Sequence, residues 1–217
     1  MTKNGLIRHV TLSEGYWEIP GVKYSGGIHT FRLYDKLTPP MNFESLAEYS
    51  RTEKQKGNPY AVSLPKFMAM CSAGKEDPAL MAHIQSNLRE SYPSFLSAVD
   101  YMPALSKSRI KDRIIHDYGM PDESSVERKF IGPDGWIKGI KDKKFLKLVS
   151  GMENIQTLDE VSSAINQTPM YLYRLNSRPS ETKDRRVVWF DADSDRLYLV
   201  CDSYPLDECP AFRVEID

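Results

Sequence analysis

Four runs of residues near the carboxyl end constrain the fold of this chain more than any other feature. Each run is rich in Val, Tyr, Trp or Leu, as β-strands are, and short connections separate several of them; they span 170–175, 186–191, 196–202 and 211–216. Successive strands joined by short connections pair antiparallel, because a parallel pair needs a long crossover. The segment therefore predicts an antiparallel β-meander with one face that other elements must cover.

The rest of the chain divides into a strand-rich beginning and a helical middle. Strand-like runs at 6–12, 16–19 and 28–34 are bounded by Pro and Gly turn signals. Beyond them, apolar residues recur at helical spacing, and the expected helix starts are Asn42 and Thr157 as N-caps and Pro65 and Pro78 in a first turn. Residues 95–102 continue this helical stripe. We predict an α+β fold in which helices cover the meander.

Length and composition limit the classes of protein that the chain can belong to. With 217 residues, 41% hydrophobic and 27% charged, it suits a single compact unit, 1–217, with 150/151 as the place for any subdivision. A formal net charge of -1 supplies no whole-protein attraction to nucleic acid or membranes. The beginning of the chain lacks a signal-peptide pattern, and no apolar run is long enough to span a membrane. We expect a cytoplasmic protein.

The clearest pointer to a partner is a basic segment, 105–149. Its eleven Lys and Arg against seven Asp and Glu give +4, which leaves -5 for the rest of the chain. Ile110, Ile114 and Tyr118 recur every four residues, which indicates a helix ended by Gly119. A second short helix over 122–130 and a hairpin that pairs 136–140 with 144–148 are expected to follow. This order, helix, turn, helix and hairpin, is similar to that of a winged-helix DNA-binding module.

We therefore interpret the chain as a non-enzymatic binding protein whose partner is a nucleic acid or an acidic protein. The expected binding residues are the exposed cations of this segment: Lys107, Arg109, Lys111, Arg113, Arg128, Lys129, Lys138, Lys143 and Lys144. Lysines and arginines there would neutralise phosphates. The second helix is short and partly acidic, however, so it has few side chains that could read bases. The plainer alternative is that these cations form ordinary solvated surface.

Two other functions stay open. A small hydrolase acting on a phosphoester could use His9 and His29 with the carboxylates of 191–195 as acid, base or metal groups. The spacing of Asp191, Asp193 and Asp195 matches the start of a calcium loop, but Arg196 stands where such a loop requires Gly, so a polar hairpin tip is favoured. The remaining alternative is a structural protein that forms homo-oligomers.

No cofactor is indicated, because the sequence has no phosphate-binding or dinucleotide-binding glycine motif. The three cysteines, Cys71, Cys201 and Cys209, are too few and too scattered for a disulfide framework or a structural zinc site. Whether Cys201 and Cys209 pair across a turn is left open at this point.

Overall fold

The computed structural model describes residues 6–11, 13–104 and 111–217, which contain five helices and twelve strands. The helices are α1 (Phe43–Gln55), α2 (Leu64–Gly74), α3 (Pro78–Ser91), α4 (Lys143–Ser150) and α5 (Ile155–Asn166). The strands are β1 (Arg8–Val10), β2 (Tyr16–Tyr24), β3 (Gly27–Tyr34), β4 (Tyr60–Ala61), β5 (Ser94–Tyr101), β6 (Asp112–His116), β7 (Ser124–Arg128), β8 (Gly135–Trp136), β9 (Met170–Arg174), β10 (Asp184–Ala192), β11 (Leu197–Ser203) and β12 (Arg213–Ile216). The predicted α+β class is confirmed.

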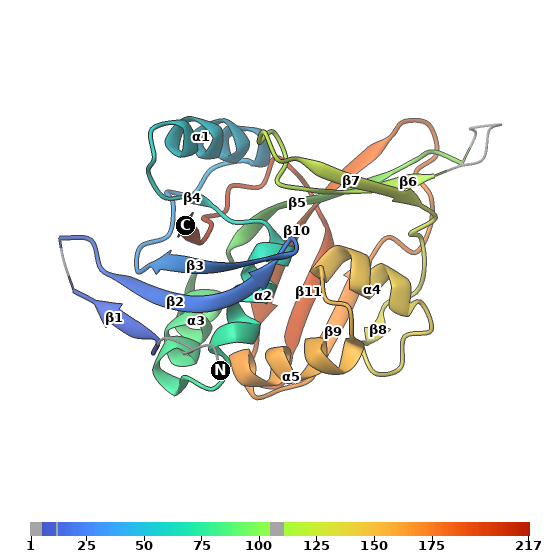
Figure 1. Cartoon of the computed structure of the whole chain (residues 1–217). Helices are drawn as coiled ribbons and strands as arrows, with labels where there is room; N and C mark the ends of the chain where they lie inside the picture. Colours follow the sequence, from blue (N-terminus) through green and yellow to red (C-terminus); the bar gives the residue numbers. More distant parts are fainter. Residues whose placement is uncertain (1–5, 12, 105–110) are drawn as a thin grey trace.

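The described strands form two sheets (Figure 1). The smaller sheet has five strands in the order β1-β2-β3-β12-β4, and the larger has seven in the order β7-β6-β5-β10-β11-β9-β8. Their described strand pairs are antiparallel except β9 with β11, which is parallel. Every helix in this part of the chain is too short or too polar to cross a lipid bilayer.

Helix α2 lies between the two sheets and joins their cores. Most of its residues are buried, as expected for a helix that is apolar nearly all round. The Phe67 ring lies 5.0 Å from that of Phe95 on β5, 6.1 Å from Phe190 on β10 and 4.8 Å from Phe212, two residues before Val214 on β12. One contiguous cluster of buried apolar side chains therefore draws on both sheets.

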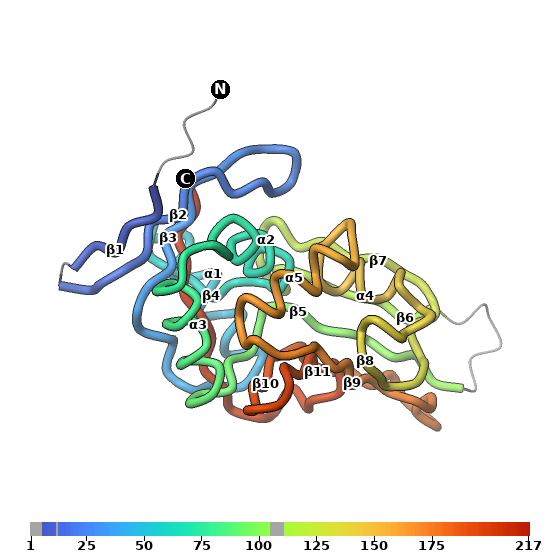
Figure 2. The backbone as a smooth tube through the Cα atoms, turned by 90° about the horizontal axis from the view of Figure 1, so that it is seen from below, coloured from blue at the N-terminus to red at the C-terminus, as the bar shows by residue number. Residues whose placement is uncertain are grey.

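The larger sheet has a helix face and an outer face. Helices α2 to α5 pack on the helix face, and Figure 2 shows β9, β10 and β11 along the margin of the molecule, beyond α5. Neighbouring strand residues point to opposite sides, so Ala98 faces away from Phe95. Ala98 packs instead with Val187 and with Phe43 at the start of α1. Helix α1 thus covers only part of the outer face.

Several helix predictions are confirmed at their starts. The Asn42 side chain accepts a hydrogen bond from the Ser45 backbone N–H and caps α1, and α2 and α3 each carry their proline in the first turn. Helix α5 begins earlier than predicted. Its N-cap is Asn154, whose side chain accepts from the Gln156 backbone N–H, in place of Thr157. The stronger capping pattern at Thr157 thus lies inside the first turn.

The winged-helix order predicted for 105–148 is wrong. Residues 112–116 and 124–128 are strands, not helices, and 143–150 forms α4, not the second strand of a hairpin. The part of the first predicted helix that covers 105–110 lies outside the described residues. Residues 94–101 are also a strand, although we expected a helical stripe there.

The physical reason is that a spacing of four residues fits both helical and strand periodicity. Four residues separate Ile114 from Tyr118, which fits one helix face, but four is also a multiple of two, so Ile114 equally marks one side of a strand. The β-branched pair Ile114 and Ile115 favours the strand. For α4, the decisive signals are Asp142, which accepts from the Phe145 backbone N–H, and Gly151, which ends the helix with φ +69.

The carboxyl-terminal runs are strands as predicted, but the prediction that they form one antiparallel meander is wrong. Strands β10 and β11 form the expected antiparallel hairpin. Strand β9 runs parallel to β11, and β12 belongs to the smaller sheet, where it lies between β3 and β4. The carboxyl end therefore ties the two sheets together.

We predict that Phe67→Ala lowers the free energy of unfolding by about 3–5 kcal/mol, because it removes a fully buried ring that three other rings surround. Chemical denaturation measures the change. The control is Leu206→Ala, since Leu206 is 80% exposed and its truncation should change stability by less than about 0.5 kcal/mol. Equal effects of the two substitutions would contradict the central place of Phe67.

Candidate binding sites

The structure divides the predicted binding residues into separate groups. Lys111 and Arg113 lie on or beside β6, and Arg128 and Lys129 lie at the end of β7. Lys138, Lys143 and Lys144 belong to the region of β8 and α4, on the helix face of the larger sheet. Lys107 and Arg109 lie outside the described residues. The nine predicted binding residues therefore do not lie together on one surface.

Around β5 and β6, four cations gather on the outer face, and we call this set the cationic face: Lys111, Arg113, Lys183 and Arg185. The Asp100 side chain, 2% exposed, accepts from the Arg185 guanidinium at 2.7 and 3.1 Å. The same carboxylate accepts from Arg113 at 3.4 Å and from Lys183 at 3.3 Å. One buried anion thus orders three cationic side chains.

The charges of the cationic face point outward because the carboxylate lies beneath them. The Arg113 and Lys183 side chains are 38% and 47% exposed. Burial raises the pKa of Asp100, but hydrogen bonds and charge from Arg185 and Lys183 outweigh this and hold the pKa below its ordinary value. Asp100 therefore stays ionised at neutral pH, and the cations keep their positions.

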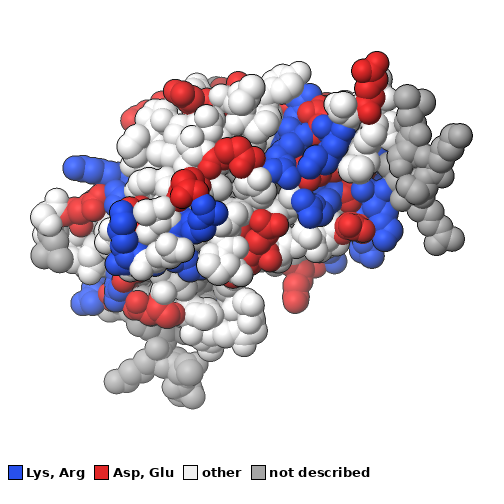
Figure 3. All heavy atoms as spheres, turned by 90° about the horizontal axis from the view of Figure 1, so that it is seen from above, with Lys and Arg blue, Asp and Glu red and all other residues white. Residues whose placement is uncertain are grey.

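Two exposed carboxylates limit the excess charge of the cationic face. Glu127 pairs with Lys111 at 3.4 Å, and Glu44 pairs with Arg185 at 3.4 Å. In Figure 3, Lys and Arg side chains gather near the end of the view where β5, β6 and β7 lie, with acidic side chains among them. The cationic face is therefore moderately positive, which suits a weak, salt-sensitive contact.

A second buried carboxylate fixes the strand ends beside the cationic face. Asp112 is fully buried and accepts from the backbone N–H groups of Met102 and Phe130. It also accepts from both ends of the Arg178 guanidinium, at 2.6 and 3.1 Å. Asp112 thereby connects β5, β6, the end of β7 and the loop before β10. This bidentate pair holds the surroundings of Arg113 and Lys183 in place.

Sequence reasoning missed Lys183 and Arg185, because they lie outside the basic segment, about seventy residues after Arg113 in the sequence. They reach it through the pairing of β10 with β5, in which Arg185 stands opposite Asp100. No pattern in the neighbouring sequence predicts the contact between Arg185 and Asp100. One feature of the sequence could have indicated it. The strand predicted for 186–191 places the basic residues just before it, Lys183 and Arg185, at the edge or end of a sheet.

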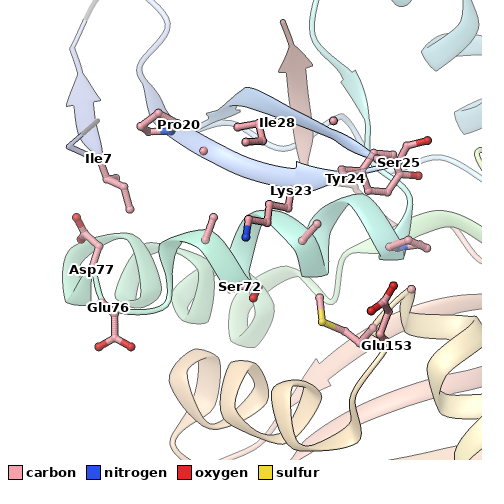
Figure 4. Close-up of a pocket in the computed structure, with 18 of the residues that line it drawn as sticks. Ile7, Pro20, Lys23, Tyr24, Ser25, Ile28, Ser72, Glu76, Asp77 and Glu153 are labelled. Carbon is pink, nitrogen blue, oxygen red and sulfur yellow. The ribbon is translucent and has the colours of Figure 1, made fainter. Parts of the chain in front are cut away.

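An open groove of about 1300 Å³ runs along α2 (Figure 4). Its floor is the side of α2 that carries Pro65, Ala69, Ser72 and Ala73. The β2–β3 hairpin forms one wall, and the loop between α4 and α5, from Gly151 to Glu153, lies on the other side. We call this hollow the α2 groove.

His116 lies at the bottom of the α2 groove and is 8% exposed. Its Nε2 donates to the Leu148 carbonyl oxygen at 2.9 Å, which leaves Nδ1 to accept from the Ser97 hydroxyl at 2.9 Å. The same Ser97 oxygen accepts from the Leu64 backbone N–H at the start of α2. The Ser97 side chain is fully buried, so this network joins β5, β6, α2 and α4 and is not open to a substrate.

The groups considered for hydrolysis lie apart. His9 Nε2 is 2.8 Å from the Asp35 carboxylate, and His29 Nδ1 is 3.1 Å from the Asp217 carbonyl oxygen. Both histidines belong to the smaller sheet, whereas Asp191 to Asp195 lie at the β10–β11 hairpin of the larger sheet. The structure does not bring these groups into one site.

The acidic turn is a hairpin tip, as favoured from the sequence. The Asp193 backbone N–H donates to the Arg196 carbonyl oxygen, and the Arg196 side chain pairs with Asp195 at 2.6 Å. Within residues 6–11, 13–104 and 111–217, no three His, Cys, Asp or Glu side chains are placed to hold a metal ion. Cys71, Cys201 and Cys209 are all free thiols, which answers the question of a Cys201–Cys209 bridge.

Comparison with known proteins adds no assignment: no protein-family model, no curated protein and no solved structure matches this chain.

We predict that the His116 ring and the partly buried His83 ring of α3 titrate below pH 6.5 in an NMR titration, because burial lowers the pKa of each. As pH falls below 6.5, the unfolded chain takes up these protons before the folded protein does. The stability contributed by the neutral rings is thus present above pH 6.5 and is lost as the pH falls toward the folded-state pKa values. A His116 ring that titrates at or above 6.5 would contradict its burial.

Proposed function

We propose that this protein is a non-enzymatic binding protein whose cationic face holds the backbone of a single-stranded nucleic acid. The observation that carries the proposal is the convergence of Arg113, Lys183 and Arg185 on the buried carboxylate of Asp100. The buried anion already holds the exposed cations in place. Binding of a phosphate therefore costs little further side-chain conformational entropy.

The spacing of these cations suits a chain of phosphates. The Arg113 guanidinium and the Lys183 ammonium approach the same Asp100 oxygen, at 3.4 and 3.3 Å, so these nitrogens lie within about 7 Å of each other. One phosphate can contact both, and Arg113 can do so with two parallel N–H groups. An acidic protein would also be attracted, but its carboxylates have no regular spacing that favours this cluster.

A single strand is favoured over a duplex because aromatic side chains continue the outer face. Alternate residues of β10 share a side, so Arg185, Val187 and Trp189 all belong to the outer face, with Val187 covered by Phe43 of α1. Strand pairing places the aromatic rings of β11, β9 and β8 beyond these residues: Tyr198, Tyr171, Tyr173 and Trp136. Aromatic rings beside a cationic path are the usual means of holding unpaired bases without reading sequence.

The rings at this end are partly open to solvent. Trp136 and Tyr173 are 42% and 37% exposed, and the Tyr173 ring stacks on Tyr198 with ring centres 5.5 Å apart. Asp191 and Asp193 lie at the same end of β10, where negative charge opposes a phosphate. We therefore place the phosphates of some nucleotides at the cationic face and the bases of other nucleotides of the same strand over the rings, about 20 Å along the sheet.

This assignment keeps the nucleic-acid partner inferred from the basic segment but moves the contact from a recognition helix to an open sheet face. The cytoplasmic location expected from the sequence is part of the proposal, and three free thiols support a reducing compartment.

The double variant Arg113→Ala/Lys183→Ala tests the cationic face, because Arg185 remains to satisfy Asp100. Fluorescence anisotropy with a dye-labelled twentymer of thymidylate measures binding over a series of salt concentrations. Loss of two phosphate contacts should reduce the slope of log K against log salt by about 1.4. The matched control, Lys143→Ala/Lys144→Ala, removes two exposed cations from α4 on the helix face and should leave the slope unchanged.

Equal losses in the two double variants would show non-specific attraction and would refute the assignment. Tighter binding to poly-glutamate than to the oligonucleotide, lost in the same variant, would replace the nucleic acid by an acidic protein. Thermal unfolding of both variants checks that the fold is intact.

The aromatic part has its own test. Tyr173→Ala should weaken binding of the same oligonucleotide by about 1–3 kcal/mol without changing the salt slope, because a ring contributes stacking and not charge. Exposed Tyr204, on the loop after β11, provides the control substitution Tyr204→Ala. An unchanged affinity in Tyr173→Ala would remove the bases from this part of the face.

A further inference from the structure

The α2 groove is too large for a small ligand. Small-molecule sites enclose about 300–1000 Å³ and bury most of their ligand, whereas this groove has about 1300 Å³ and is open along its length. From Pro65 to Ala73 the helix rises about 12 Å, which matches about four residues of an extended chain. Its shape is that of a channel for a segment of polymer.

The floor and one wall allow a polypeptide backbone to come close. Ala69, Ser72 and Ala73 have short side chains and are at least partly exposed along the floor. On the wall, the β2–β3 register passes from Ile19 opposite Phe31 to Val22 opposite His29, so Pro20 and Gly21 form a bulge. Gly21 has φ +76, a conformation that favours glycine, and both bulge residues line the groove. Such bulges turn backbone groups out of the ladder.

The charges along the α2 groove exclude nucleic acid and favour a basic peptide. Figure 4 shows Glu76 and Asp77 near one end, Glu153 near the other, and Lys23 pointing into the space between them. Three carboxylates against one ammonium make the lining acidic. Glu76 and Glu153 are exposed, whereas the Asp77 carboxylate already accepts from backbone N–H groups at the start of α3.

Apolar side chains on the rim add a reason for a protein partner. Ile28 is 68% exposed and Leu6 is 90% exposed, and both line the groove together with Pro20. Exposed apolar side chains beside a groove contribute favourable binding free energy when an apolar surface of a partner covers them. An extended peptide can place alternate side chains on this rim and on the α2 floor.

We propose that the α2 groove binds an extended segment of another protein that carries Lys or Arg at two positions about four residues apart, with small or apolar residues between them. The two cations pair with Glu153 and Glu76, and a carbonyl or carboxylate between them accepts from Lys23. This site is separate from the cationic face and carries the opposite charge. The proposal does not depend on nucleic-acid binding.

The probe is a dye-labelled octapeptide, acetyl-Ala-Lys-Ala-Leu-Ala-Lys-Ala-Leu-amide, and the matched probe has Glu at both Lys positions. Fluorescence anisotropy at low salt should show at least about tenfold tighter binding of the Lys peptide. Ala73→Trp, which fills the groove from an exposed position, should weaken binding of the Lys peptide by a similar factor. The control Ala79→Trp makes the same change at an exposed position of α3 that does not line the groove, and it should leave binding of the Lys peptide unchanged.

Charge reversal gives the sharper result. Glu76→Lys/Glu153→Lys should exchange the preference, so that the Glu peptide binds more tightly than the Lys peptide, while binding of the thymidylate twentymer by the cationic face stays unchanged. Equal affinity for the two peptides, or no effect of Ala73→Trp, would overturn the proposal. Self-association of the protein that Ala73→Trp abolishes, without peptide binding, would make a second copy the occupant and would also overturn it.

Discussion

The burial of α2 between two sheets is the constraint on which the rest of the structure depends. Its Phe67 ring contacts aromatic rings from both sheets, and its Lys66 ammonium, 4% exposed, pairs with Asp117 at 2.8 Å and Asp122 at 2.7 Å. Burial lowers the pKa of Lys66, but the charge of Asp117 outweighs this and raises it overall. An ion pair this deeply buried costs several kcal/mol if one partner is removed, so it fixes the turn after β6 against α2.

Both proposed binding surfaces follow from this arrangement. The side of α2 that neither sheet covers becomes the floor of the α2 groove, and its short side chains leave the space open. The larger sheet uses its helix face for the core, which leaves most of its outer face beyond α1 for exposed cations and aromatic rings. Because the two surfaces differ in charge, they select different partners, one anionic and one basic.

The sequence alone predicted those helices and strands that are marked by capping residues, prolines or residue composition within the element itself. Asn42, Pro65 and Pro78 correctly marked the starts of three helices, and the Val- and Tyr-rich runs after Met170 correctly indicated strands. It was misleading where one spacing fits two periods, as with Ile114, and it could not place Lys183 and Arg185 beside Asp100, because strand pairing between distant segments decides that contact. The α2 groove escaped prediction for the same reason, since the residues that line it come from six separate stretches of chain.

The central claim is that one core, organised by α2, makes the described chain a single cooperative unit, as the length of the sequence also led us to expect. Native-state hydrogen exchange under increasing denaturant tests this most directly. The account predicts that the slowest amides of α2, β3 and β10 exchange with one shared opening free energy and one denaturant dependence. Exchange of β3 through a lower-energy opening, while α2 and β10 stay protected, would show that the smaller sheet unfolds by itself and would contradict the claim.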